Sequence, residues 1–256
     1  MFGQQITPLL QDRIGYLPEE RGLYKKMQVR RVLLFLAELK GIGPSEAAKR
    51  IDQWLERFSL TTDRNWGDAR VDELSRGMQQ KVQFIATLLH DPDLVILDEP
   101  FSGLDPINAQ ALKDAVLELK QRGKTVIFST HVMDNAEKMC DSVCIIARGE
   151  KVLDGGVAAV KKSAGSRNIA VSLAGGAQNG VSAVLRDPTF VRRCDDNNNY
   201  FELELFPNAD AQLLLRRLID AGANIERFEL MQPSLHQIFL QRVGASGVEM
   251  GMSGHG

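Results

Sequence analysis

Apolar residues in the first hundred positions recur at the spacing of amphipathic helices. Two such stripes run through residues 32–39 and 47–58, and a break rich in glycine, Gly41-Ile42-Gly43-Pro44, separates them. A third helix is expected after Leu74-Ser75-Arg76-Gly77, up to about His90, where the turn Asp91-Pro92-Asp93 ends it. The pattern therefore predicts three consecutive helices.

The pattern changes after this turn. Two apolar runs, Leu94–Leu97 and Thr125–Phe128, show no alternation, which is typical of strands buried on both faces of a parallel sheet. A helical stripe of Leu112, Val116 and Leu119 lies between them. Strand, helix and strand in this order predict a βαβ unit with a right-handed crossover, and therefore an α/β fold.

Short strands replace this pattern beyond residues 163–167. They are expected at residues 169–173, 190–194, 200–205 and 225–230, with a helix before the last strand and another at 234–243. We therefore expect three parts: an α/β domain over residues 1–163, a small α+β domain over 164–243, and a disordered tail rich in Gly and Ser over 244–256.

Composition narrows the class of protein. The 256 residues carry a formal net charge of −2, which argues against a basic surface for nucleic acid. The three cysteines form no zinc pattern and no even disulfide set, which favours a reducing compartment. The longest apolar run, Val32–Ala37, is too short to span a bilayer, and the N-terminus shows no secretory signal. These observations predict a cytosolic protein.

Polar residues follow both predicted strands. The first strand ends in Asp98-Glu99-Pro100 and the second in Ser129-Thr130-His131. Ligands of open parallel sheets bind at the carboxyl ends of the strands. One carboxylate there can hold Mg²⁺, and the next can orient or deprotonate a water molecule. The alternative is that the acidic pair only caps a helix or lies in a solvated loop.

Four motifs occur together in a known order and spacing. They resemble the signature motif, the Walker B motif, the D-loop and the switch histidine of the ATP-binding cassette (ABC) ATPases, over about residues 14–153: Leu74-Ser75-Arg76-Gly77-Met78, Asp98-Glu99, Ser102-Gly103-Leu104-Asp105 and His131. The resemblance implies an ABC-type P-loop NTPase domain, with a mainly parallel sheet and a helical subdomain, followed by the small C-terminal domain. It also implies ATP and Mg²⁺ as cofactors.

The resemblance implies roles for residues at the sheet edge and the D-loop. Asp98 would be the carboxylate that holds Mg²⁺, and Glu99 would be the general base. His131 would contact the γ-phosphate, and Asp105 would couple the two sites of a dimer.

Other implied roles depend on the signature motif and on the Q-loop. A helix begins near Ser75 and Gly77, so its unpaired N–H groups and the Ser75 hydroxyl can meet an anion. The resemblance implies that this anion is the γ-phosphate of a nucleotide held by the opposite subunit. The signature departs from the usual LSGGQ at Arg76 and Met78. Ile14-Gly15-Tyr16-Leu17-Pro18-Glu19 resembles the Q-loop, but Glu19 stands where glutamine is usual. A carboxylate there can still hold Mg²⁺ or water; its alternative is a plain loop carboxylate beside Glu20 and Arg21.

The phosphate-binding loop of the family, GxxxxGK[ST], does not occur in the sequence. Loss of a single donor to a transition state costs about 10²–10³ in rate, so the chain alone is expected to hydrolyse ATP poorly or not at all. The reading frame begins further upstream, the gene is truncated, or the subunit is degenerate. We favour an upstream start or a truncated gene, because the motifs that remain are intact.

The resemblance extends to one branch of the family. The segments Pro18–Tyr24, Leu74–Gln83 and Pro233–Phe239 are similar to those of two-component exporters of sodium, drugs or antibiotics. This implies an ATPase subunit at the cytoplasmic face of the membrane, with separate transmembrane permease subunits and a second ATPase subunit as partners. The alternatives are a degenerate cassette that completes the site of an intact ATPase, and a non-transport ABC ATPase. The last class has two cassettes or a long coiled coil, and the sequence has neither.

Overall fold

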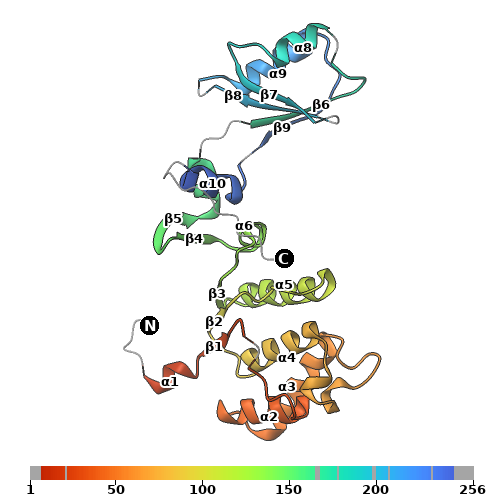
Figure 1. Ribbon diagram of the computed structural model, residues 1–256, viewed down its shortest axis with the longest axis vertical. Coiled ribbons are helices and arrows are strands. Elements are labelled where there is room, and N and C mark those ends of the chain that lie inside the picture. The colour runs from red at the N-terminus through yellow and green to blue at the C-terminus, as the bar shows by residue number, and fades with distance from the viewer. Residues whose placement is uncertain are drawn as a thin grey trace. The chain divides into compact units, whose positions relative to one another are not determined.

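The structure is a computed structural model, and it describes residues 7–20, 22–164, 168–177, 179–197, 200–206, 208–231 and 233–244. The chain divides into two compact units, Met1–His131 and Val132–Gly256. Figure 1 shows the elements of each unit. The predicted disordered tail, apart from Gly244, lies outside the described residues.

Unit 1 contains the predicted helices and the βαβ unit. In chain order its elements are α1 (Pro8–Gln11), β1 (Ile14–Leu17), α2 (Val29–Leu39), α3 (Pro44–Arg57), the 3-10 helices Trp66–Asp68 and Val71–Glu73, α4 (Arg76–Leu88), β2 (Leu94–Leu97), α5 (Pro106–Gln121) and β3 (Thr125–Phe128). The three strands form a parallel sheet in the order β1-β2-β3, with Leu17, Leu97 and Phe128 in register. The expected α/β architecture is confirmed.

The helical part of unit 1 is held together by its apolar stripes. Leu33 of α2 and Ile51 of α3 are fully buried, as the helical spacing predicts. Phe58 follows α3 and packs edge-to-face on Phe84 of α4, with ring centroids 5.9 Å apart. The side chain of Lys81 is buried in the same region and donates to the carbonyl of Phe58 at 3.0 Å.

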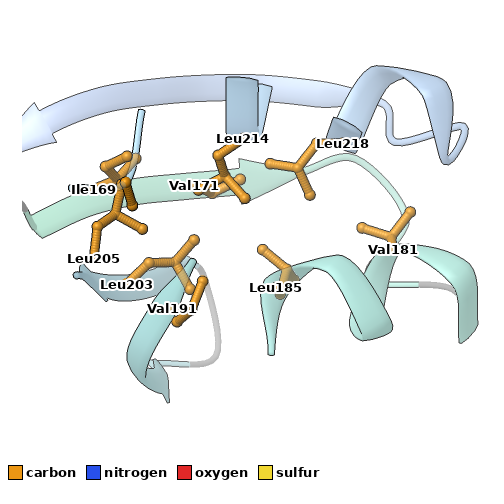
Figure 2. Close-up of a cluster of buried hydrophobic side chains, with 10 residues drawn as sticks. Ile169, Val171, Val181, Leu185, Val191, Leu203, Leu205, Leu214 and Leu218 are labelled. Carbon is orange, nitrogen blue, oxygen red and sulfur yellow. The ribbon is translucent and has the colours of Figure 1, made fainter. Parts of the chain in front are cut away.

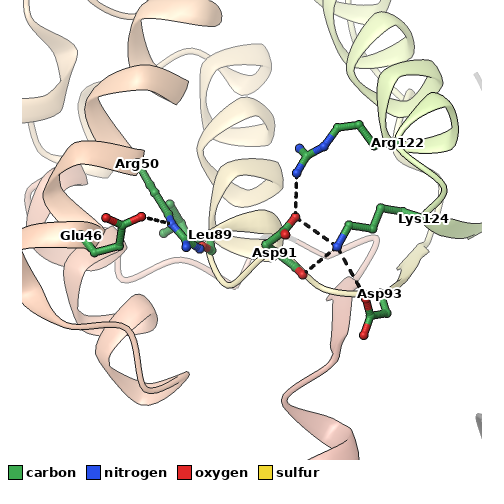
Figure 3. Close-up of polar contacts among 7 residues, drawn as sticks. All are labelled: Glu46, Arg50, Leu89, Asp91, Asp93, Arg122 and Lys124. Carbon is green, nitrogen blue, oxygen red and sulfur yellow. Dashed lines mark hydrogen bonds and ion pairs between the residues drawn. The ribbon is translucent and has the colours of Figure 1, made fainter.

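Polar contacts hold the turn between α4 and β2 (Figure 3). Arg50 of α3 donates to the carbonyl of Leu89 at 2.6 Å, just beyond the end of α4. Asp91 in the turn forms ion pairs with Arg122 at 3.0 Å and Lys124 at 3.2 Å. The side chain of Lys124 is only 14% exposed, and its Nζ also donates to the carbonyl of Asp91. These contacts join α3, α4, α5 and β3 at the amino ends of β2 and β3.

Unit 2 contains two apolar clusters, and the first surrounds a hairpin. Its elements are α6 (Met133–Met139), β4 (Ser142–Ala147), β5 (Glu150–Gly156), α7 (Val157–Ser163) and, from the far end of the chain, α10 (Leu235–Gly244). Val143, Val160, Leu235 and Ile238 form the core of this cluster. The C-terminal helix therefore packs against elements more than seventy positions earlier in the sequence.

The second cluster lies under an antiparallel sheet. The sheet has the order β7-β8-β6-β9 and comprises β6 (Asn168–Leu173), β7 (Val191–Asp196), β8 (Phe201–Leu205) and β9 (Ile225–Met231); α8 (Asn179–Leu185) and α9 (Ala211–Asp220) pack against it. Figure 2 shows Val171, Leu203, Leu214 and Leu218 meeting in its core. The four predicted strands and the helix before the last strand are confirmed. The boundary placed after residue 163 stays a prediction.

Candidate functional site

The carboxyl ends of the three parallel strands bring the predicted site residues to one edge of unit 1. The ladder continues one residue past the strands, because the N–H of Asp98 donates to the carbonyl of Leu17 at 2.8 Å and the N–H of Ser129 to that of Leu97 at 2.9 Å. Asp98 and Ser129 are thereby fixed at the ends of β2 and β3. Parallel pairing in register is the reason that residues so far apart in sequence meet here.

Ser129 connects the two adjacent carboxylate residues. Its Oγ donates to Oδ1 of Asp98 and accepts the N–H of Glu99 at 2.9 Å. Glu99 has a φ of 43°, in the left-handed region that side chains other than glycine seldom adopt. The hydroxyl of Ser129 thus holds the Asp98 side chain and supports the backbone of Glu99 in this costly conformation.

Glu99 and His131 form a pair. Oε1 of Glu99 accepts the backbone N–H of His131 at 2.8 Å and lies 2.9 Å from Nδ1 of its ring. The side chain of Glu99 is 17% exposed, whereas that of His131 is 72% exposed. The carboxylate is therefore oriented by its neighbour, while the ring can still be reached from solvent.

The start of α4 carries the signature residues. Ser75 is the N-cap of this helix, and its Oγ accepts the N–H of Met78 at 3.3 Å. Gly77 has a packing reason in addition to the one that its motif implies. A Cβ at this position would lie 2.8 Å from Nδ2 of Asn108, too close for any larger residue without a shift.

Asp105 is the N-cap of α5 and is connected through Asn108 to Gly77 at the start of α4. Its Oδ1 accepts the N–H groups of Ile107 and Asn108, and its Oδ2 accepts from the side chain of Asn108. The backbone N–H of Asn108 is the main reason that the pKa of Asp105 is lowered, and the Asn108 side chain adds to it. Asn108 therefore links Asp105 to Gly77, and the carboxylate stays ionised at neutral pH.

The structure brings the predicted residues together in two groups. Asp98, Glu99 and His131 form one. In the other, Gly77 and Asp105 meet through Asn108, and Gly77 lies two residues after Ser75. Glu19 is exposed two residues beyond β1, and no hydrogen bond or ion pair joins it to the other predicted residues in the described part of the chain.

The residues of the site supply some of the groups that would hold Mg²⁺ and some of those that would hold ATP. The described residues include no group of three or more His, Cys, Asp and Glu side chains that could hold a metal by itself. A single carboxylate such as Asp98 suits Mg²⁺, which keeps several waters and takes the remaining ligands from phosphates. The N-terminus of α4, a helix of 13 residues, suits one phosphate oxygen. The sequence supplies no glycine-rich loop and lysine to enclose the other phosphates.

Two residues that sequence reasoning did not assign belong to this arrangement, namely Ser129 and Asn108. A signal for Ser129 was present, because a polar residue that follows a buried strand points to a site at the sheet edge. Asn108 had no such signal, because its contact with Gly77 depends on how α4 and α5 pack. No helix in the described ranges is long and apolar enough to cross a membrane.

Comparisons with known proteins show which families this chain resembles. The family "ABC transporter" matches residues 2–102, and "ATP-binding protein DrrA1-3-like, C-terminal domain" matches residues 155–243. The uncharacterised ABC transporter ATP-binding protein YhaQ of Bacillus subtilis is 40% identical over 95% of this chain and 78% of its own length. The linearmycin resistance ATP-binding protein LnrL of the same organism is 26% identical over 93% and 76%. A solved structure of the ATP-binding subunit of an ABC transporter has a TM-score of 0.55 and 31% identity, over 60% of this chain and 62% of the solved chain.

Proposed function

Because the chain belongs to the family of ABC transporter ATP-binding proteins, we propose that it is the ATP-binding subunit of an exporter that moves separate membrane subunits through ATP-dependent dimerisation. It has the ABC ATPase fold, with a parallel sheet, a helical part and a C-terminal domain. The observation that carries the proposal is the connection of Asp98, Ser129, Glu99 and His131 at the carboxyl ends of β2 and β3. The subunit would lie at the cytoplasmic face of the membrane.

The residues at the sheet edge have distinct tasks in this proposal. Bound Mg²⁺ would offset the negative charge of the phosphates, and Asp98 would hold it. Oε1 of Glu99 is occupied by His131, which leaves its second oxygen to take a proton from an attacking water molecule. The ring of His131, which is 72% exposed and has Nδ1 beside Glu99, would contact the γ-phosphate.

We expect weak turnover by the chain alone. No segment of its sequence supplies the glycine-rich loop and lysine that enclose the phosphates in this family. The sheet also supports an incomplete site, because Ile127 of β3 is 55% exposed, whereas parallel sheets are normally covered on both faces.

The names of two relatives support an export role. One is the linearmycin resistance ATP-binding protein LnrL, and the other is the Nod factor export ATP-binding protein I of Burkholderia orbicola. A membrane partner would need an apolar surface on this chain. Tyr24 and Phe35 provide one, because they pack edge-to-face with centroids 5.9 Å apart and remain 53% and 39% exposed. We propose this pair as part of the contact with the membrane subunits.

A degenerate cassette is the second candidate. In a dimer the signature residues of one chain would face the nucleotide of the other, so Ser75 and Gly77 could complete a site in an intact partner. Their helix start is well formed in this chain. The two candidates differ in which residues matter, since the first requires Glu99 and the second requires Ser75 but not Glu99.

ATP hydrolysis by the complex that co-purifies with the tagged chain from its own cells separates the two candidates. An active subunit predicts that Glu99→Gln lowers turnover by at least about 10²-fold, the usual cost of losing a general base. A degenerate subunit predicts wild-type turnover for Glu99→Gln and loss of turnover for Ser75→Arg. Glu56→Gln on the exposed face of α3 is the matched control. Wild-type turnover in both Glu99→Gln and Ser75→Arg would refute both candidates.

A further inference from the structure

One side chain of α4 holds the backbone on both sides of Glu19. Nε2 of Gln83 donates to the carbonyl of Pro18 at 3.3 Å and to the carbonyl of Glu20 at 3.2 Å. An amide nitrogen carries two hydrogens, so both are used on these carbonyls. The residue that carries the loop carboxylate is thereby held between two anchored neighbours.

The Gln83 side chain is buried, and these two bonds are the only hydrogen bonds of its amide among the described residues. The residue is 6% exposed, and its Oε1 is buried with no hydrogen-bond partner. A buried unpaired oxygen opposes folding. Turning the amide over would not relieve this cost, because the oxygen would then face two carbonyl oxygens. A glutamine at this position therefore contributes through what its nitrogen binds.

Gln83 belongs to a polar stripe that faces backbone carbonyls. Gln80, Gln83 and Thr87 lie on one side of α4, at the i, i+3 and i+7 positions. Gln80 donates to the carbonyl of Pro100 at 3.4 Å. The hydroxyl of Thr87 lies 3.3 Å from the carbonyl of Tyr16 and 3.0 Å from that of Gln83, and its one hydrogen is shared between them. Side chains of this helix thus bind the backbone that follows both β1 and β2.

Close packing keeps α4 and β1 at a fixed distance. A Cβ on Gly15 would lie 2.6 Å from the carbonyl oxygen of Thr87, so no larger side chain fits between the helix and the strand. The same helix begins at Ser75, two turns before Gln83. A displacement of the Glu19 loop would therefore be transmitted to the start of the helix.

We propose that Gln83 is a positioning residue, which fixes the backbone around Glu19 relative to the start of α4 at Ser75. The inference rests on the proposed function, because a task for Glu19 near Mg²⁺ or water presupposes a nucleotide site. The mechanical part, in which Gln83 holds the loop, stands on the contacts alone. The two parts are tested separately.

The mechanical part is tested by NMR relaxation of the backbone amide of Glu19 in the chain without ligand. Gln83→Met keeps the volume but has no N–H donors, so the order parameter of this amide should fall from about 0.85 to below about 0.6. The matched control is Gln79→Met. Gln79 lies on the same helix and also donates to two carbonyls, those of Val71 and Leu74, away from the Glu19 loop. It should leave the Glu19 amide ordered.

A second variant keeps the test decisive if Gln83→Met does not fold. In Gln83→Glu the side chain can donate only when its carboxyl is protonated. The Glu19 amide should therefore be mobile at neutral pH and more ordered in acid, a dependence that a purely space-filling role does not produce. An unchanged order parameter in both variants, or an equal loss in Gln79→Met, would overturn the proposal.

The functional part uses the co-purified complex. Gln83→Met should raise the Mg²⁺ concentration for half-maximal ATP turnover by about tenfold, roughly the loss of one to two hydrogen bonds, while Gln79→Met leaves it unchanged. A mobile loop with an unchanged Mg²⁺ requirement would contradict the role of Glu19 and leave the mechanical part standing. No ATP turnover in the wild-type complex would refute the proposed function instead.

Discussion

Glu99 illustrates how single residues carry the site. Its backbone lies in the left-handed region at a φ of 43°, which is unfavourable for a side chain with a Cβ. Three contacts compensate for this cost: its N–H donates to Ser129, and its Oε1 faces the N–H and the ring of His131. At the scale of residues, the proposed general base is held by groups that follow the neighbouring strand β3.

Replacement of Ser129 tests this support. Ser129→Ala removes the bond to Asp98 and the acceptor for the N–H of Glu99, so the free energy of unfolding of unit 1 should fall by about 1–2 kcal/mol. Ser129→Thr keeps the hydroxyl and should retain most of the stability. Urea unfolding followed by circular dichroism measures both. Equal stability of the alanine variant and the wild type would show that the hydroxyl does not support Glu99.

At the scale of elements, α10 joins the cluster around α6 and α7. Oε2 of Glu137 on α6 accepts the N–H of Leu235 at the start of α10, at 2.8 Å. Oε1 of Glu137 is paired with Lys161 of α7 at 2.5 Å. Leu235 is fully buried and Ile238 nearly so. One carboxylate and two apolar side chains thus attach the C-terminal helix, which closes the cluster that follows His131 in the chain.

Truncation of Leu235 tests the apolar part of this attachment. Leu235→Ala removes a fully buried side chain, so the free energy of unfolding of unit 2 should fall by about 2–5 kcal/mol. Leu240→Ala in the same helix is the control, because Leu240 is 37% exposed and should cost less than about 1 kcal/mol. Calorimetry compares the two. Similar losses for both would mean that α10 is not seated through Leu235.

The pH dependence of stability tests the polar part. Burial raises the pKa of Glu137, but the hydrogen bonds from Lys161 and Leu235 and the charge of Lys161 outweigh it, so the pKa is lowered in the folded state. The stabilisation is therefore present above the unfolded pKa, near 4.5, and is lost as the pH falls through the folded pKa.

Glu137→Gln should accordingly be less stable than the wild type at pH 7, by about 1.5–3 kcal/mol, and the difference should shrink towards pH 3. Asp134→Asn on the same helix is the control, because Asp134 pairs with Lys138 at the surface and such pairs contribute little. Urea unfolding at several pH values measures the difference. A constant difference over this range would rule out the carboxylate as its source.

At the scale of the whole molecule, the parallel sheet ends in an exposed edge strand. The described strands pair in the order β1-β2-β3, so β3 presents a row of backbone groups on its outer side. Ile127 on this strand is 55% exposed. An exposed apolar edge strand is a template for pairing with another chain.

We therefore predict that the isolated chain self-associates through β3. Ile127→Lys places a charge on the edge and should lower the weight-average sedimentation coefficient at high protein concentration. Leu39→Lys, which changes a residue of α2 that is 65% exposed, should leave association unchanged. Equal association of the two variants and the wild type would locate the contact elsewhere.

Periodicity and motif spacing determined much of this protein from sequence. The stripes of α2 and α3, the buried β2 and the βαβ unit follow from preferences among near neighbours, which local sequence records. The position of three residues after two apolar runs marked them as candidate site residues: Asp98, Glu99 and His131. These features need no knowledge of how distant segments pack.

Only the tertiary structure decided the contacts that unite these parts. Ser129 meets Asp98 across 31 positions, and Glu137 meets Leu235 across 98. Asn108 against Gly77, and Gln83 against the carbonyls around Glu19, likewise depend on how α4 packs on α5 and β1. No local preference encodes such pairs, because the free energy of each contact exists only after the chain has brought the two elements together.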